Sequence, residues 1–249
     1  NCFNFLKKMN KLLFTFTLIC CFLSIQLFSE QLILNPKQIL NVHTGELFKS
    51  QILIEEGMIV RIERGLSKKN KNVRVIDLSA LTLLPGLMDS HVHLIGNTKL
   101  KGYESIGESS YLSTIYGVDN AKKTLLAGFT TVRNVGAGNY ADVALKEAID
   151  RNLVSGPTML VSGPALGITG GHCDSNILPY DYQHKSQGVA DGPWEVRKMV
   201  RQNRKYGANL IKFCATGGVM SKNTNVNNKQ YTLEEMQAIV DEAHSHGMK

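Results

Sequence analysis

The sequence has few cysteines, few prolines and a single tryptophan among its 249 residues. Six prolines and 22 glycines are too few for a collagen-like chain, and 43% apolar residues exceed what a disordered polymer carries. The five cysteines form an odd set with three of them in the first 21 residues, which does not indicate a disulfide framework. The composition therefore predicts one large globular domain or two smaller ones.

Charge is also scarce, and the two signs are nearly balanced. Lys and Arg total 28 against 21 Asp and Glu, which gives a net charge of +7. The basic residues are scattered and are not interleaved with aromatic residues, so no nucleic-acid partner is expected. The sequence also lacks a Walker-type loop and a dinucleotide-binding glycine fingerprint, so no nucleotide cofactor is expected.

One apolar run stands out, and it lies near the N-terminus. Leu12–Phe28 follows Lys11 and precedes the small residue Ser29. This arrangement predicts a signal peptide over residues 1–29 and hence a secreted or periplasmic protein. The alternative is an N-terminal membrane anchor, because the run is at the lower length limit for crossing a bilayer. We expect contact with a membrane through this segment alone.

After this segment the pattern is typical of a small β module over residues 31–84. Four β-rich runs are separated by glycines, at residues 32–34, 51–54, 58–62 and 73–77. From residue 85 onward, strand-like runs alternate with helical segments. The strands are predicted at 86–94, 130–134, 158–162 and 210–214, and the helices at 119–128, 140–152, 193–206 and 232–246. Such β–α repeats predict a parallel sheet with helices outside it, but four units are too few to close an eight-stranded barrel.

Local signals refine this pattern at two places. Thr232 and Glu235 form a capping box for the last predicted helix, and Gly247 is suited to end it. The connection between Gly163 and Gly192 is unusually long, and long connections in such folds often line functional sites.

The strongest candidate for chemistry is the stretch Leu84–His93, which contains His91 and His93. On a strand, residues i and i+2 point to the same side, so the two imidazoles can chelate one metal ion. The alternative interpretation is two polar residues at a strand end.

Lys212 is the second candidate, because it interrupts an apolar strand that ends in Gly217-Gly218. An ammonium is costly to bury, so a lysine in such a strand tends to lose its proton. A neutral amine can react with carbon dioxide, and the resulting carbamate has two oxygens that can bridge two metal ions. The alternative is a lysine whose ammonium reaches solvent at the strand end.

Together these features resemble the amidohydrolase superfamily. Pro85-Gly86-Leu87-x-Asp89-x-His91-x-His93 is similar to its first-strand metal motif, and Ala127–Arg133 is similar to its second strand. Lys212 falls where one branch has a carboxylated lysine. The loop Ala165–Asp174 is most similar to imidazolonepropionase-like and Xaa-Pro dipeptidase-like members, the latter being prolidase-type carboxypeptidases. The resemblance covers about residues 31–249.

The resemblance implies an α/β fold. Residues 85–249 would be the first half of a TIM-like (β/α)8 metal-dependent hydrolase barrel, and residues 31–84 part of a small β-sandwich. It also implies two divalent metal ions, zinc in the first place, although manganese and cobalt also suit such ligands. His91, His93 and the carbamate formed from Lys212 and CO2 would be ligands. The remaining ligands and a catalytic Asp are expected beyond Lys249, so the sequence is interpreted as a truncated one.

The activity implied is hydrolysis of a carbon–nitrogen amide bond through attack by a metal-bridging hydroxide. The substrate is expected to be a small molecule or peptide, in the first place a dipeptide or an N-acyl amino acid. His172 is a candidate for holding the substrate carboxylate, with a solvated loop histidine as the alternative. A cyclic amidase or imidazolonepropionase-like hydrolase and an inactive truncated remnant stay open, as does assembly into a homo-oligomer.

Three further residues are weaker candidates. Arg133, at the end of the second strand, is interpreted as structural in the first place, with a substrate-carboxylate partner as the alternative. His244 and His246 lie at the end of a predicted helix, where positions i and i+2 do not share a face, so we do not expect them to bind the metal.

Overall fold

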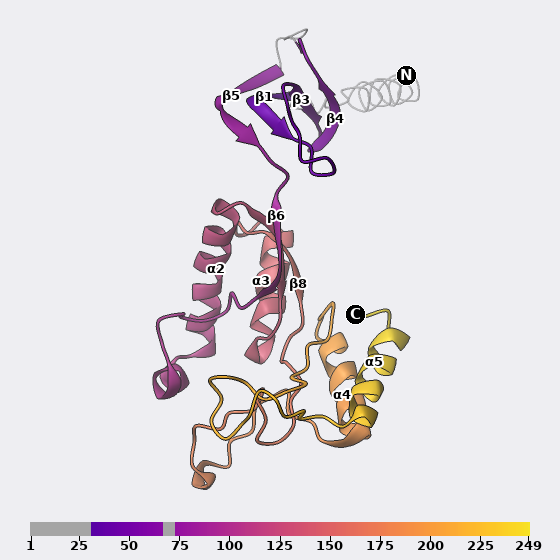
Figure 1. Ribbon diagram of the computed structural model, residues 1–249. Coiled ribbons are helices and arrows are strands. Elements are labelled where there is room, and N and C mark those ends of the chain that lie inside the picture. The colour runs from indigo at the N-terminus through magenta and orange to yellow at the C-terminus, as the bar shows by residue number, and fades with distance from the viewer. Residues whose placement is uncertain (1–30, 67–72) are drawn as a thin grey trace, which may run out of the picture. The chain divides into compact units, whose positions relative to one another are not determined.

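The computed structural model describes residues 31–66 and 73–249 (Figure 1). These residues belong to two compact units that meet between Pro85 and Gly86. The segment interpreted as a signal peptide, residues 1–29, lies outside the described residues. Within the described ranges, no helix has the length and apolar character needed to cross a membrane.

The first unit is one five-stranded sheet. Its strands are β1 (Gln31–Leu40), β2 (Leu47–Phe48), β3 (Gln51–Glu55), β4 (Met58–Glu63) and β5 (Val73–Leu83). The order is β2-β1-β3-β4 with antiparallel neighbours, and β5 pairs in parallel with β1.

The small core of this unit follows from the alternation of side chains along the strands. Ile33, Leu53 and Val73 are buried together on one face. Glu56 and Gly57, both with positive φ, turn the chain from β3 into β4 as a two-residue hairpin loop requires. All residues of β4 are exposed. The described residues thus form a single layer, without the second layer that the expected β-sandwich requires.

The second unit contains a parallel sheet of order β6-β7-β8. Its strands are β6 (Leu87–Val92), β7 (Phe129–Asn134) and β8 (Thr158–Val161). The helices α2 (Ser110–Leu126) and α3 (Ala141–Asp150) pack beside each other against this sheet (Figure 1). The α2 helix begins well before the predicted residue 119, because the Ser109 side chain caps it by accepting a hydrogen bond from the Tyr111 amide.

The second unit also contains a second pair of helices. The helices α4 (Gly192–Lys205) and α5 (Leu233–Ser245) pack against each other (Figure 1). Their shared core includes Leu166, Val196, Val200, Tyr231 and Ile239. Short 3-10 turns, η1 (Gly102–Gly107), η2 (Gly138–Tyr140) and η3 (Tyr180–Tyr182), interrupt the connections. The predicted capping box of α5 is confirmed, since Thr232 and Glu235 bond each other's backbone amides.

The prediction of a regular strand over residues 210–214 is wrong. The segment lies parallel to residues 161–166, and the Leu166 amide donates to the Lys212 carbonyl at 2.8 Å. The Asn209 side chain accepts a hydrogen bond from the Val161 amide and so replaces a backbone ladder bond. The described residues therefore form an α/β fold with a three-stranded parallel sheet, and they do not close a barrel.

Glu242 on α5 ties α5 to α4. Its buried carboxylate accepts hydrogen bonds from Arg201 at 2.6 Å, from Arg197 at 3.3 Å and from His246 at 3.1 Å. The bonds from Arg201 are the main cause that lowers the pKa of Glu242 to about 2. Because the pKa is depressed in the folded state, the ionised carboxylate stabilises the fold above its ordinary pKa of 4.5. This contribution is lost as the pH falls toward 2.

Glu242→Gln is therefore expected to destabilise the protein in a pH-dependent way. The free energy of unfolding should fall by about 1–2 kcal/mol at pH 7, a modest value because Arg201 is mostly exposed. The difference from the unmodified protein should shrink as the pH falls below 4.5. Urea unfolding between pH 3 and 7 measures it, with the exposed Glu234→Gln as the control. A difference that does not change with pH would contradict the assignment.

Candidate functional site

The carboxyl ends of the parallel strands and two long connections surround one cavity of about 680 Å³. Residues 135–139, after β7, and the connection Gly163–Gly192 supply much of its wall. No Asp or Glu lines it. Nitrogen-bearing side chains from distant parts of the sequence gather there: His91, His93, His172, His184, Lys185 and Lys212.

His91 and His93 reach this cavity from the end of β6. The pairing of β6 with β7 is irregular between Asp89 and Val92, and the Asp89 carboxylate accepts a hydrogen bond from the His91 amide at 2.9 Å. The two imidazole centroids lie 5.4 Å apart, in an edge-on arrangement. The spacing of i and i+2 thus brings both rings to one cavity, as the sequence predicted.

Arg133 on β7 supports the irregular part of β6. Its Nε donates to the carbonyl of Ser90 at 2.7 Å, where the regular ladder is interrupted. Arg133 does not line the cavity. It lines a second cavity together with His91 and Lys212.

Lys212 lines the same cavity as the two histidines, although it is over a hundred positions away in the sequence. Its backbone is held by the bond from Leu166, and its side chain is half-buried. Among the described residues, no carboxylate forms an ion pair with it. The cavity therefore presents an amine beside two imidazoles, with no anion to balance it.

The electrostatics of the cavity favour neutral imidazole at His93. Burial is the main cause that lowers the pKa of His93, and its electrostatic interactions with His91, Lys212 and His172 lower it further. A hydrogen bond with the Gly136 backbone acts in the opposite direction. Neutral imidazole is the form that binds metal ions.

Asn134 and Asp142 hold the strand ends behind the histidines. The Asn134 side chain accepts from the Leu94 amide at 2.8 Å and donates to Asp142 at 3.3 Å. Asp142 also accepts from the Gly163 amide at 3.1 Å, and both side chains are fully buried. Burial raises the pKa of Asp142, while these hydrogen bonds oppose the shift. The pair thus fixes the carboxyl ends of all three parallel strands.

Asn134→Ala is expected to destabilise the protein by about 2–4 kcal/mol, because it leaves the Leu94 amide without its acceptor and removes one of the hydrogen-bond donors of the buried Asp142. Denaturant unfolding of the full-length protein measures the loss. The exposed Asn227→Ala serves as the control and should change the stability by less than about 0.5 kcal/mol. Equal effects of the two substitutions on the free energy of unfolding would contradict the role of Asn134 in fixing the strand ends.

The segment that follows Lys212 holds His172 in the cavity wall. The Nδ1 atom of His172 lies 2.5 Å from the Ser221 hydroxyl, and its amide donates to the Gln230 side chain at 3.0 Å. A Cβ at Gly218 would lie 2.0 Å from the His172 ring, so only glycine allows this approach. The sequence identified His172 but missed Ser221 and Gln230, which are distant from it in the chain.

A disulfide joins Cys173 to Cys214, with a Cα–Cα distance of 5.9 Å. The cysteine count did not indicate a disulfide framework, and this bond corrects that expectation for the two cysteines. Their positions carried a signal, since one directly follows His172 and the other follows Lys212 by two residues.

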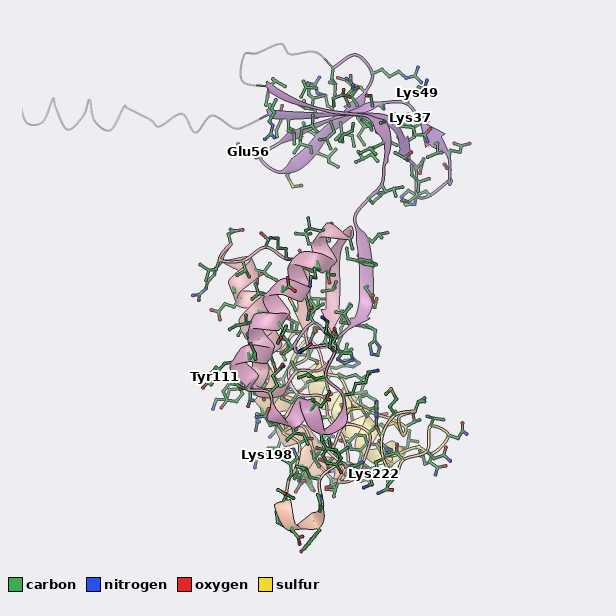
Figure 2. All side chains as sticks on the ribbon, turned by 90° about the vertical axis from the view of Figure 1, so that its left-hand side faces the viewer. Lys37, Lys49, Glu56, Tyr111, Lys198 and Lys222 are labelled. Atoms are coloured by element: carbon green, nitrogen blue, oxygen red, sulfur yellow. A yellow bond between two sulfur atoms is a disulfide. The ribbon has the colours of Figure 1, made fainter. Side chains whose placement is uncertain are left out.

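Other candidates lie away from the cavity. His244 and His246 do not line it, and His246 binds Glu242. Tyr111, an aromatic residue in the first turn of α2, does not line the cavity either and is 84% exposed (Figure 2). Among residues 31–66 and 73–249, no cluster of three or more His, Cys, Asp and Glu side chains is arranged to hold a metal ion.

The comparisons with known proteins identify the family. Residues 82–249 match the model of the amidohydrolase family, so the chain belongs to this family. It is 35% identical over 179 residues to ochratoxinase from Aspergillus niger, an alignment of 65% of this chain and 36% of ochratoxinase.

Solved structures share the fold. The structure resembles a Xaa-Pro dipeptidase with bound methionine in the active site, with 33% identity and a TM-score of 0.80 over 88% of this chain and 55% of that one. It also resembles a prolidase complexed with N-methylphosphonate-L-proline, with 30% identity and a TM-score of 0.72 over 88% of this chain and 54% of that one. The chain thus spans about half the length of these structures.

Proposed function

We propose that the protein hydrolyses the carbon–nitrogen amide bond of a dipeptide or an N-acyl amino acid, with divalent metal ions at the cavity. The observation that carries this proposal is the convergence of His91, His93 and Lys212 on one cavity. Similarity to a Xaa-Pro dipeptidase and to ochratoxinase supports the choice of an amide substrate. The cavity volume of about 680 Å³ is suited to a ligand of dipeptide size.

The residues present fit part of a two-metal centre. Two neutral imidazoles are good ligands for zinc, and the amine of Lys212 becomes an oxygen ligand once it is carboxylated. In that modification the Lys212 nitrogen bonds to the carbon of CO2 and one N–H proton is released to solvent. The carbamate brings the negative charge that the cavity wall lacks. The other ligands and the catalytic Asp implied by the resemblance are not assigned to any described residue.

Each side chain then has a defined task. His91 and His93, at the end of β6, and the carboxylated Lys212 would hold the metal ions at the cavity. When bound, the metal ions supply Lewis acidity and make water acidic enough to act near neutral pH. His172 binds the free carboxylate of the substrate and orients the amide toward the two histidines.

We also propose that the described second unit is part of a (β/α)8 barrel and that the first unit is part of a β-sandwich. Zinc is the metal we expect. The protein is proposed to act outside the cytosol, as a secreted or periplasmic enzyme. The Cys173–Cys214 disulfide supports this location, because such bonds persist in oxidising compartments.

The test uses the purified full-length protein. Metal content is measured by elemental analysis, and hydrolysis is followed with Met-Pro, with N-acetyl-L-methionine and with a cyclic amide such as dihydroorotate. We expect bound zinc and turnover of one of the two linear substrates, Met-Pro or N-acetyl-L-methionine. Turnover of the cyclic amide alone would shift the assignment to a cyclic amidase. If the purified protein contains no divalent metal ion, the proposal is refuted.

A further inference from the structure

The geometry points to the Cys173–Cys214 disulfide as a positioning element for substrate binding. We propose that it holds His172 against the Lys212 segment so that His172 can bind the free carboxylate of the substrate. This inference rests on the function proposed above. It assigns a task to two residues that take no part in metal binding.

The location of the disulfide supports this task. Cys173 directly follows His172 in the loop after β8, and Cys214 follows Lys212 by two residues. Both cysteines line the cavity beside the two residues that they flank. The bond spans 41 positions of sequence, and Cys214 is only 5% exposed. It therefore anchors the loop to a buried point of the wall that carries Lys212.

The loop is also shaped to bring Cys173 to this point. A Cβ at Gly167 would lie 2.6 Å from the Cβ of Cys173, so a side chain at Gly167 would push the cysteine away. Asp174, next in the chain, accepts hydrogen bonds from the amides of Gly170 and Ser186. These contacts fold the loop on itself, and the disulfide attaches it to the Lys212 segment.

The disulfide adds a covalent restraint to the few non-covalent contacts of His172. The His172 side chain is exposed and has a polar contact with the Ser221 hydroxyl, whereas Gln230 accepts a hydrogen bond from the His172 backbone amide. Hydrogen bonds at an exposed site contribute little net stability, since water replaces them. His91 and His93, in contrast, are placed by β6 and by the buried Asn134. Opening the disulfide should therefore loosen His172 and leave the metal ligands in place.

The bond can be opened chemically or by substitution. Dithiothreitol supplies two electrons and two protons, so the disulfide becomes two thiols and the reagent becomes its cyclic disulfide. Cys173→Ser with Cys214→Ser removes the bond permanently with side chains of similar size. In both cases KM for the linear substrate with its free carboxylate should rise about tenfold or more. This is the effect expected for losing one charge-assisted hydrogen bond. The kcat value and the metal content should change little.

The experiment uses full-length, metal-loaded protein and three measurements. Peptide mapping without reductant detects the 173–214 link. Titration calorimetry with L-methionine, and with L-methioninamide as the probe that lacks a carboxylate, measures carboxylate binding. Hydrogen exchange compares the loop peptide 165–176 with the β6 peptide 87–94. Each measurement is made on the unmodified protein, on the double serine variant, on His172→Asn and on the combination.

The expected result is a linked peptide, L-methionine affinity lower by about tenfold in the double serine variant, and faster exchange confined to the loop. In the His172→Asn background, loss of the disulfide should have no further effect on L-methionine affinity. Free thiols in the purified protein, loss of metal with the disulfide, or an equal effect in the His172→Asn background would overturn the positioning role. If the unmodified protein binds no metal, the proposed function fails. If it binds metal and L-methionine and the disulfide has no influence on that affinity, this inference alone fails.

Discussion

Lys212→Met is expected to lower kcat/KM of the full-length protein by more than about 100-fold, beyond the 10- to 100-fold losses typical of residues that only support a metal ligand. Methionine is similar in length to lysine but offers no amine for CO2, so the proposed carbamate could not form. The metal content should fall together with the activity. Elemental analysis of the purified variant and steady-state kinetics measure the two effects.

The cavity itself supplies the control for this prediction. Lys185 lines the same cavity and is exposed, so Lys185→Met removes one positive charge from the same wall without touching the proposed ligands. It should keep its metal and most of its activity. Lys212→Glu, which restores a carboxylate near the same place, should recover part of the metal content. If Lys212→Met retained full metal occupancy, the carbamate assignment would be wrong.

Replacing His91 or His93 by asparagine is expected to weaken metal binding by more than about 100-fold, because each substitution removes a proposed ligand and not a supporting contact. The two rings lie 5.4 Å apart at the end of one strand, so both should be required. Competition with a chelator of known affinity measures the metal dissociation constant for each variant. Thermal unfolding of the metal-free variants shows whether the fold is intact.

His184→Asn is the matched control, since His184 lines the same cavity from the long loop and is exposed. Its metal affinity should equal that of the unmodified protein. A loss at His184 as large as that at His91 would mean that the metal lies elsewhere in the cavity. A difference between His91 and His93 would rank their contributions to metal binding.

Several elements followed from the sequence because their signals are local. The alternation of strands and helices from residue 86, the capping box of Thr232 with Glu235, and the shared face of His91 and His93 depend on spacings of two to four residues. The expected start of α2 at residue 119 was too late, since the cap at Ser109 outweighed a weaker apolar periodicity. The regular strand expected at 210–214 was wrong because the Asn209 side chain takes a ladder position.

In the candidate site, too, some features follow from the sequence and others only from the tertiary structure. The sequence determined which residue types carry the chemistry: two imidazoles at strand spacing, an amine in an apolar segment and a histidine after two glycines. Only the tertiary structure decided that they share one cavity, that Asn134 and Asp142 fix the strand ends, and that Cys173 is joined to Cys214. These contacts link residues far apart in the chain, and no local spacing encodes such a pairing. The pairing arises only in the folded chain, where the buried polar groups and the ends of the strands must find hydrogen-bond partners.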